Sequence, residues 1–158
     1  MLEIKLNKDR FKFSSAHFTI FDENSAERLH GHNYYVSCSL FFTQDLKNGI
    51  VAPFADLKTD LENTCASLDE RVLIPMRSKF LEISETNHEI EVKFGRKRYV
   101  FPSEDVKMLD MENLTSECLA IYIGKELVQL WKYLKPNELR VRISETTGQS
   151  VEWVYDGF

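Results

Sequence analysis

Long hydrophobic runs are missing from this chain of 158 residues. No apolar stretch approaches the roughly 20 residues that a transmembrane helix needs, and Met1 to Lys5 lacks the apolar core of a signal peptide. We therefore expect a cytoplasmic protein with no membrane partner. The composition, 43% hydrophobic and 28% charged, is ordinary for a globular protein. The length suits one domain, which we predict to span residues 1–158.

Cysteines and basic clusters are scarce as well. The three cysteines, Cys38, Cys65 and Cys118, lie far apart and are odd in number, which favours reduced thiols over a disulfide framework. The densest basic cluster, Gly95 to Arg98, lies between two apolar stretches and is typical of a hairpin tip. With 20 basic against 25 acidic residues and a net charge of −5, nucleic acid is not expected as a partner.

Hydrophobic periodicity predicts where strands and helices lie. Alternating segments rich in aromatic and β-branched residues indicate strands, and apolar residues three or four positions apart indicate helices. Strands are predicted at residues 5–18, 30–43, 139–143 and 151–155, helices at 53–68 and 116–134, and a turn at Lys47-Asn48-Gly49.

The stretch between the two helices, about residues 76–110, follows a different pattern. It predicts three short strands, at residues 79–83, 89–94 and 98–101, and no linker-like composition bounds it. We interpret it as an inserted β-hairpin region within the domain. The remaining order of elements is strand, strand, helix, helix, strand, strand. That order predicts an α+β fold in which an antiparallel four-stranded sheet carries two helices on one face.

Histidine is rare too, and two of the four histidines form the motif His30-Gly31-His32. Residues two apart on a strand face the same side, so both imidazoles should project together. Gly31 would permit a close backbone approach on the opposite face. His17 ends the preceding predicted strand, and antiparallel pairing would bring it beside the other two. Three neutral imidazoles leave one tetrahedral position of a zinc ion open, as in catalytic sites. A coincidental pair of strand histidines is the alternative.

Several motifs in a fixed order resemble one protein family. Phe13-Ser14-Ser15-Ala16-His17 is followed by Leu29-His30-Gly31-His32-Asn33-Tyr34, and then by short motifs at residues 54–58, 68–69, 114–117 and 144–146. Together they resemble the 6-pyruvoyltetrahydropterin synthase family, which also contains 6-carboxytetrahydropterin synthases. The resemblance covers both ends and the middle of the chain and excludes about residues 75–110.

The resemblance implies a fold, a metal and an assembly. The family has the tunnelling fold, in which subunits join their sheets into barrels, commonly as trimers stacked into hexamers. A homo-oligomer is therefore expected, and closing a sheet through its neighbours protects open strand edges. The family's Zn²⁺ ligands match His17, His30 and His32.

The resemblance also implies how a pterin substrate is held. The family's pterin anchor, a glutamate, matches Glu145. A carboxylate can accept both the ring N–H and the exocyclic amine of a pterin in a charge-assisted pair. Thr115 and Ser116 match hydroxyl positions that help to hold the pterin, although an N-cap role would explain them equally well. Glu117 is either a second pterin contact or an acid in the first helical turn.

The chain departs from the family pattern at two places. The catalytic cysteine, four residues before the first histidine of the motif, is replaced by Ala26. Of the aspartate–histidine pair that serves this cysteine, Asp69 remains and Glu70 takes the histidine position. The two carboxylates would suit acid–base work by sharing one proton, or they would cap a helix end and pair with Arg71. We favour a catalytic role for Asp69 and leave Glu70 open.

Glu27 offers a replacement for the missing cysteine. It precedes the histidine motif by three residues, which resembles a branch of the family that converts 7,8-dihydroneopterin triphosphate to 6-hydroxymethyl-7,8-dihydropterin. In that branch a glutamate takes over the proton transfer, and zinc acts as a Lewis acid on the side-chain oxygens of the substrate. A dry pocket raises the pKa of such a carboxylate and a nearby zinc ion lowers it; the sequence leaves that balance open. The alternative is a solvated loop acid.

Two other functions stay open. One is a pyruvoyl-type, carboxy-type or deazapurine-precursor synthase with altered proton carriers. The other is a non-catalytic pterin-binding homologue that has lost the cysteine and the histidine together. Ala26 and Glu70 favour the second alternative, and Glu27 argues against it.

Overall fold

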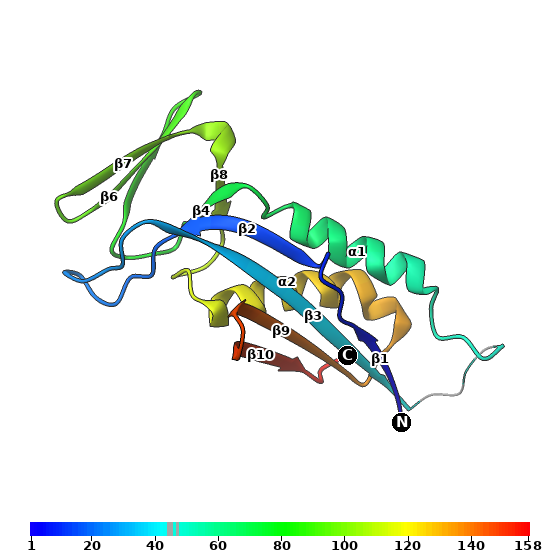
Figure 1. Cartoon of the computed structure of the whole chain (residues 1–158). Helices are drawn as coiled ribbons and strands as arrows, with labels where there is room; N and C mark the ends of the chain where they lie inside the picture. The colour runs from blue at the N-terminus through cyan, green and yellow to red at the C-terminus, as the bar shows by residue number, and fades with distance from the viewer. Residues whose placement is uncertain (44–45, 47) are drawn as a thin grey trace.

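The computed structural model describes residues 1–43, 46 and 48–158. Two helices lie against one face of a long sheet, and a smaller sheet projects beyond one end (Figure 1). The helices are α1 (Phe54–Ala66) and α2 (Ser116–Trp131). The strands are β1 (Leu2–Leu6), β2 (Lys12–His17), β3 (His30–Phe42), β4 (Arg71–Pro75), β5 (Glu82–Glu85), β6 (Glu89–Phe94), β7 (Lys97–Pro102), β8 (Val106–Leu109), β9 (Glu138–Thr146) and β10 (Gln149–Tyr155).

The main sheet confirms the α+β class and is wider than the four strands expected. Its order is β10-β9-β3-β2-β4-β8, with β1 also paired to β3, which makes seven strands. The pairs among β10, β9, β3 and β2 are antiparallel, whereas β4 and β8 are added in parallel. With only five and four residues, these two strands are too short to show a clear period.

The first predicted strand, at residues 5–18, is in fact two strands. β1 pairs with the second half of β3, ending at Leu6 opposite Cys38, and β2 pairs with the first half, starting at Lys12 opposite Tyr35. Between them the backbone turns, and the side chain of Phe11 is fully buried. The long strand β3 therefore holds both segments in one layer.

Both predicted helices are confirmed. Each buries one apolar stripe against the sheet. α1 buries Leu57, Leu61 and Cys65, and α2 buries a longer set that ends at Trp131. At Gly124 the helix passes so close to Trp153 that an added Cβ would lie 2.1 Å from the indole ring. None of the described helices is long and apolar enough to span a bilayer.

The insertion forms its own three-stranded sheet, β5-β6-β7. The first of these strands was predicted at residues 79–83 and lies instead at Glu82–Glu85. Ile90, Val92 and Phe94 of β6 pack with Phe18 and other apolar residues that follow β2. This second apolar core attaches the insertion beside the polar loop that leads to β3. The tip turns at Gly95, whose φ is +55°.

Two smaller predictions concern turns and thiols. Lys47, the first residue of the predicted turn, lies outside the described residues, and the next two residues have positive φ, as the turn requires. The three cysteines are free thiols, as predicted.

Candidate active site

The strand register brings the three predicted histidines together. β2 and β3 are antiparallel, with His17 opposite His30 and Ser15 opposite His32. Directly opposed residues share a face, so all three imidazoles lie on one side of the sheet. One nitrogen from each ring falls within 4.8 Å of the others, which confirms the predicted cluster.

Backbone carbonyls orient two of these rings. Nδ1 of His17 donates to the carbonyl of Leu114 at 3.2 Å, and Nδ1 of His30 donates to the carbonyl of Arg28 at 2.6 Å. Because a carbonyl can only accept, each Nδ1 carries the proton and each Nε2 keeps a free lone pair. Such outer partners are typical of histidines that bind metal ions.

Electrostatics favours the neutral imidazole at His17. Burial lowers the pKa of His17, and the neighbouring His30 and His32 lower it further, against the opposing hydrogen bond to Leu114. Nε2 of His30 and Nε2 of His32 lie only 2.9 Å apart, where two lone pairs repel unless a proton or cation separates them. A tetrahedral zinc ion, about 2.1 Å from each nitrogen, would hold them about 3.4 Å apart. The donor set therefore fits such an ion.

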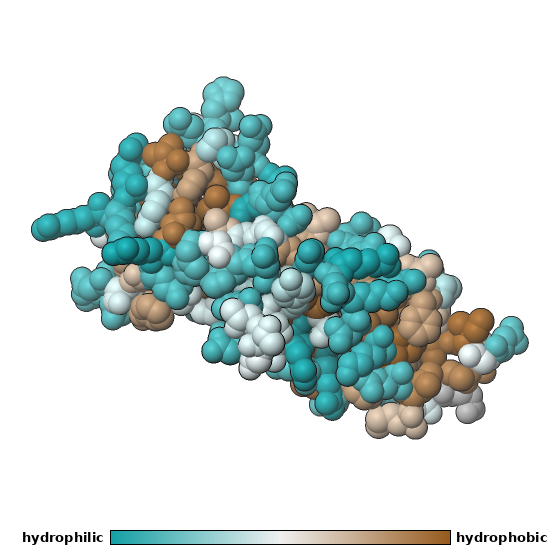
Figure 2. Space-filling view, in the orientation of Figure 1, coloured by the Kyte–Doolittle hydropathy of each residue, from teal (hydrophilic) through white to brown (hydrophobic). Residues whose placement is uncertain are grey.

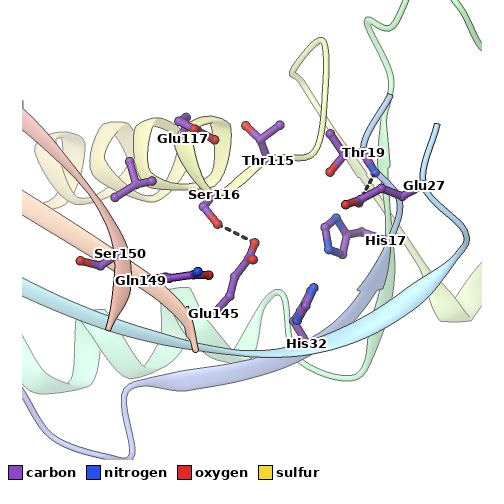
Figure 3. A pocket seen from close by; sticks show the side chains of 11 residues that line it. His17, Thr19, Glu27, His32, Thr115, Ser116, Glu117, Glu145, Gln149 and Ser150 are labelled. Atoms are coloured by element: carbon purple, nitrogen blue, oxygen red, sulfur yellow. Dashed lines mark hydrogen bonds between the residues drawn. The ribbon is translucent and has the colours of Figure 1, made fainter. Parts of the chain in front are cut away.

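A cavity of about 350 Å³ opens beside the histidines. Figure 3 shows His17 and His32 on one side and Ser116 and Glu145 on the other, with the start of α2 above them. The lining comes from β2, the β2–β3 loop, β3, the start of α2, β9 and β10, through His17, Thr19, Glu27, His32, Thr115, Ser116, Glu117, Glu145, Gln149, Ser150 and Val151.

The four residues predicted to hold the pterin all line this cavity. Glu145 accepts a hydrogen bond of 2.6 Å from the hydroxyl of Ser116, which fixes the carboxylate. Thr115 is the N-cap of α2 and its hydroxyl accepts from the backbone N–H of Cys118 at 3.2 Å. The N-cap reading is thus confirmed for Thr115, and Ser116 is left free to orient the carboxylate. Glu117 is exposed at the rim.

Glu27 is held at the edge of the site by backbone hydrogen bonds, with 36% of its side chain exposed. Its carboxylate accepts from the backbone N–H of Thr19 at 3.0 Å, and its own N–H donates to the Thr19 carbonyl at 2.9 Å. The carboxylate lies 4.0 Å from Nε2 of His30. Burial raises its pKa, but the hydrogen bonds with Thr19 and the adjacent histidines together outweigh burial, so the pKa of Glu27 is lowered.

Asp69 and Glu70 lie elsewhere. The carboxylate of Asp69 accepts from the backbone N–H of Ser14 at 2.7 Å, and Glu70 donates its N–H to the Ser14 carbonyl at 2.7 Å. Glu70 lines a second hollow of about 540 Å³ on the outer side of β2 and β3. The guanidinium of Arg71 donates a hydrogen bond to the carbonyl of Glu104. The catalytic role of these two carboxylates stays a prediction, since neither lines the cavity that the chain forms by itself.

The structure adds residues that sequence reasoning missed. Leu114 contributes only its backbone carbonyl to the site, and this carbonyl also accepts from the hydroxyl of Thr19 at 3.1 Å. Because any residue has such a carbonyl, the side chain of Leu114 could not have indicated this role. Asn113 bonds both backbone groups of Ile20, at 3.1 and 2.8 Å. The hydroxyl of Tyr34 lies 2.9 Å from Nε2 of His17. Tyr34 lies two residues after His32, within the motif at residues 29–34, and this strand spacing could have indicated it.

The architecture and the site define a tunnelling-fold protein with a histidine cluster beside an acid-lined cavity. The chain belongs to the 6-pyruvoyl tetrahydropterin synthase family, whose sequence profile it matches over residues 6–155. Family membership establishes pterin synthase-type activity as the coarse function. The family typically binds a metal, and the histidine cluster of this chain meets that requirement.

Individual relatives agree with this assignment. A Methanocaldococcus jannaschii protein provisionally named 6-carboxy-5,6,7,8-tetrahydropterin synthase is 30% identical over 152 residues, 94% of this chain and 93% of that protein. The 6-pyruvoyl tetrahydropterin synthase of Plasmodium vivax is 29% identical, with a TM-score of 0.89 over 98% of both chains. The Plasmodium falciparum enzyme has the same TM-score and coverage at 26% identity. Two further vivax structures carry alanine or cysteine in place of a catalytic glutamate.

Proposed function

We propose that this chain is a zinc-dependent lyase that converts 7,8-dihydroneopterin triphosphate to 6-hydroxymethyl-7,8-dihydropterin. One observation carries the proposal: the carboxylate of Glu27 is held 4.0 Å from a histidine of the cluster, at the edge of a cavity whose far wall presents Glu145. A proton carrier, a candidate metal site and a pterin anchor thus share one space.

The pterin ring is assigned to the end of the cavity near Glu145. A volume of about 350 Å³ lies within the range of small-molecule sites, roughly 300 to 1,000 Å³. The Ser116 hydrogen bond holds the Glu145 carboxylate in place, so the ring N–H and exocyclic amine meet a preorganised acceptor pair. This orientation places the side chain of the substrate toward His17, His32 and Glu27.

The histidines would hold the zinc ion, which supplies Lewis acidity to side-chain oxygens of the substrate when bound. Glu27 then removes the proton of the hydroxyl beside the bond that breaks. As this hydroxyl becomes an aldehyde, the electron pair of the carbon–carbon bond passes to the carbon that stays on the ring. Glu27 returns the proton to that carbon, so the step is redox-neutral and one carboxylate serves as base and acid.

The lowered pKa of Glu27 keeps its carboxylate ionised before substrate binds, so it is able to accept a proton. Ala26 cannot supply a thiolate. The Plasmodium vivax relative has a glutamate described as a catalytic residue, and we assign the same role to Glu27 here. The alternative product, a carboxy-type tetrahydropterin, is favoured by the name of the Methanocaldococcus jannaschii relative.

Product analysis tests the proposal. The zinc-loaded chain is incubated with 7,8-dihydroneopterin triphosphate, and the oxidised pterins are separated by chromatography with fluorescence detection. Hydroxymethylpterin is the expected product. A carboxypterin or pyruvoyl-derived pterin would assign the chain to the alternative synthases, and unchanged substrate would indicate a non-catalytic pterin-binding protein.

A cytoplasmic homo-oligomer, trimer or hexamer, forms part of the same proposal. β8 and β10 end the order of the main sheet, so each can accept a strand from a neighbouring subunit. Apolar side chains are also exposed at the end that holds the N-terminus and the loop before α1 (Figure 2), among them Leu2, Ile50 and Phe54. Light scattering after size-exclusion chromatography measures the subunit number, and a monomer at assay concentration would contradict this expectation.

A further inference from the structure

We propose that Asn113 is a positioning residue whose side chain holds both His17 and Glu27 in their places. It lies between β8 and α2 and acts through the backbone of two residues, Ile20 and Leu114. The inference rests on the proposed function and deepens it, because it assigns the residue that sets a metal ligand and the proton carrier relative to each other.

The Asn113 amide makes three hydrogen bonds to backbone groups. Its Oδ1 accepts from the N–H of Ile20 at 3.1 Å and from the N–H of Leu114 at 2.9 Å, and its Nδ2 donates to the carbonyl of Ile20 at 2.8 Å. An amide oxygen has two lone pairs, so it can serve both donors. Ile20 is buried, and buried backbone groups need such partners. Toward Ile20, the side chain therefore takes the place of a neighbouring strand.

Ile20 connects Asn113 to Glu27. Ile20 forms an antiparallel bridge with Ala26, and beside this bridge the N–H of Glu27 donates to the carbonyl of Thr19 at 2.9 Å. The N–H of Thr19 donates in return to the Glu27 carboxylate at 3.0 Å (Figure 3). The place of this carboxylate is thus set by the stretch of backbone that Asn113 binds.

Leu114 connects Asn113 to His17. Leu114 is bound to Asn113 at its N–H, and its carbonyl accepts from Nδ1 of His17 at 3.2 Å and from the hydroxyl of Thr19 at 3.1 Å. These bonds tie the residue before the N-cap of α2 to the end of β2. One amide therefore joins the supports of a metal ligand and of the proton carrier.

Loss of the Asn113 amide should affect metal binding and turnover more than binding of the pterin ring. Groups that orient metal-binding histidines typically contribute 10- to 100-fold to metal affinity or activity, and a small misplacement of a reacting group lowers turnover. The pterin anchor is held separately, because Glu145 accepts its hydrogen bond of 2.6 Å from Ser116. A residue that only stabilised the fold would leave all three properties of the folded protein unchanged.

Asn137 provides a matched control. Its Oδ1 accepts from the N–H and the hydroxyl of Thr43, at 2.7 and 2.8 Å, so it too is an amide that holds the chain at the end of a strand. It precedes β9, whereas Glu145 lies near the other end of that strand. Asn137→Ala should therefore cost stability, as Asn113→Ala does, without changing the site. Urea denaturation of both variants measures that cost and shows that each is folded.

Three measurements on the full chain test the inference. Zinc affinity is measured by competition with a chromogenic chelator, kcat with 7,8-dihydroneopterin triphosphate at saturating zinc, and ring affinity by fluorescence titration with unsubstituted pterin. For Asn113→Ala we expect zinc affinity and kcat to fall by about 10- to 100-fold and ring affinity to change by less than about twofold. Asn137→Ala should match the wild type in all three. Asn113→Asp keeps an acceptor for both N–H groups and loses the donor to Ile20, so it should fall between wild type and Asn113→Ala.

Wild-type zinc affinity or wild-type kcat in Asn113→Ala overturns the inference, and so does an equal loss in Asn137→Ala or a ring affinity that falls as far as kcat. If Asn113→Ala does not fold, wild-type values in Asn113→Asp overturn it. Each of these leaves the product of the wild-type chain, and hence the proposed function, intact. A wild-type chain that forms no hydroxymethylpterin overturns the proposed function, while the zinc affinities still test Asn113. A wild-type chain that binds no zinc overturns both.

Discussion

The two faces of the β2–β3 pair bear very different hollows. On the helix side, the cavity of about 350 Å³ is lined by side chains that backbone groups and neighbouring hydroxyls hold in place, among them His17, Glu27 and Glu145. A second, larger hollow of about 540 Å³ is lined by the small residues Ala16 and Gly31, by Glu70 and, in part, by His32. The histidine cluster together with the fixed carboxylates Glu27 and Glu145, rather than volume, therefore marks the candidate site.

Substitutions on the two faces of the β2–β3 pair should differ most in their effect on metal binding. His32→Ala removes one of three ligands, and we expect zinc to be lost, because two imidazoles alone do not hold a catalytic zinc site. Elemental analysis of the purified protein measures it. Asn33→Ala, on the outer face, should retain the metal. If both variants kept zinc equally, the histidine cluster would not be the metal site.

Loss of the proton carrier should be next in size. Glu27→Ala is expected to lower turnover by about 10² to 10⁴, the usual contribution of general acid–base catalysis, with zinc content unchanged. Glu23→Ala, an exposed acid of the same loop, is the control and should keep full activity. Product formation is followed with 7,8-dihydroneopterin triphosphate. Full activity in Glu27→Ala would reject Glu27 as the base.

Loss of the anchor charge should have a smaller effect. Glu145→Gln keeps the shape of the side chain but replaces one acceptor oxygen with a donor, so a charge-assisted pair is lost. A hydrogen bond to a charged group contributes about 1.5 to 3 kcal/mol, which predicts roughly 10- to 100-fold weaker pterin binding in a fluorescence titration. Zinc content should not change. Unaltered pterin affinity would move the pterin ring away from Glu145.

The smallest expected effect is on stability and comes from substituting one of two glycines, Gly124 or Gly31. Gly124→Ala places a Cβ 2.1 Å from the Trp153 ring, whereas a Cβ at Gly31 would meet its nearest atom, the Ser15 carbonyl oxygen, at 3.6 Å. We expect Gly124→Ala to lower the free energy of unfolding by about 1 to 3 kcal/mol, as overpacking does, and Gly31→Ala to change it little. Urea denaturation measures both. Equal destabilisation would mean that the outer face is as tightly packed as the helix face.

Some sequence predictions were wrong or incomplete. Gly31 was expected to permit a close backbone approach, yet an added Cβ there meets only ordinary contact distances. The catalytic role predicted for Asp69 and Glu70 stays a prediction: in the single chain both bond to Ser14, and Glu70 lines the second hollow. The prediction that residues 1–158 form one domain stays a prediction.

The sequence by itself determined the histidine cluster and the fold class. A strand repeats every two residues, so His30 and His32 had to share a face, and alternating or three-to-four spacing identified the main elements. Tertiary structure decided what no local period encodes: the antiparallel register that sets His17 opposite His30, and the Leu114 carbonyl that fixes a tautomer. It also decided the balance of burial and hydrogen bonds that lowers the pKa of Glu27. The register, the tautomer and the pKa all depend on groups that are distant in sequence. A backbone carbonyl in particular is chemically the same in every residue, so no sequence pattern can reveal which one meets a histidine.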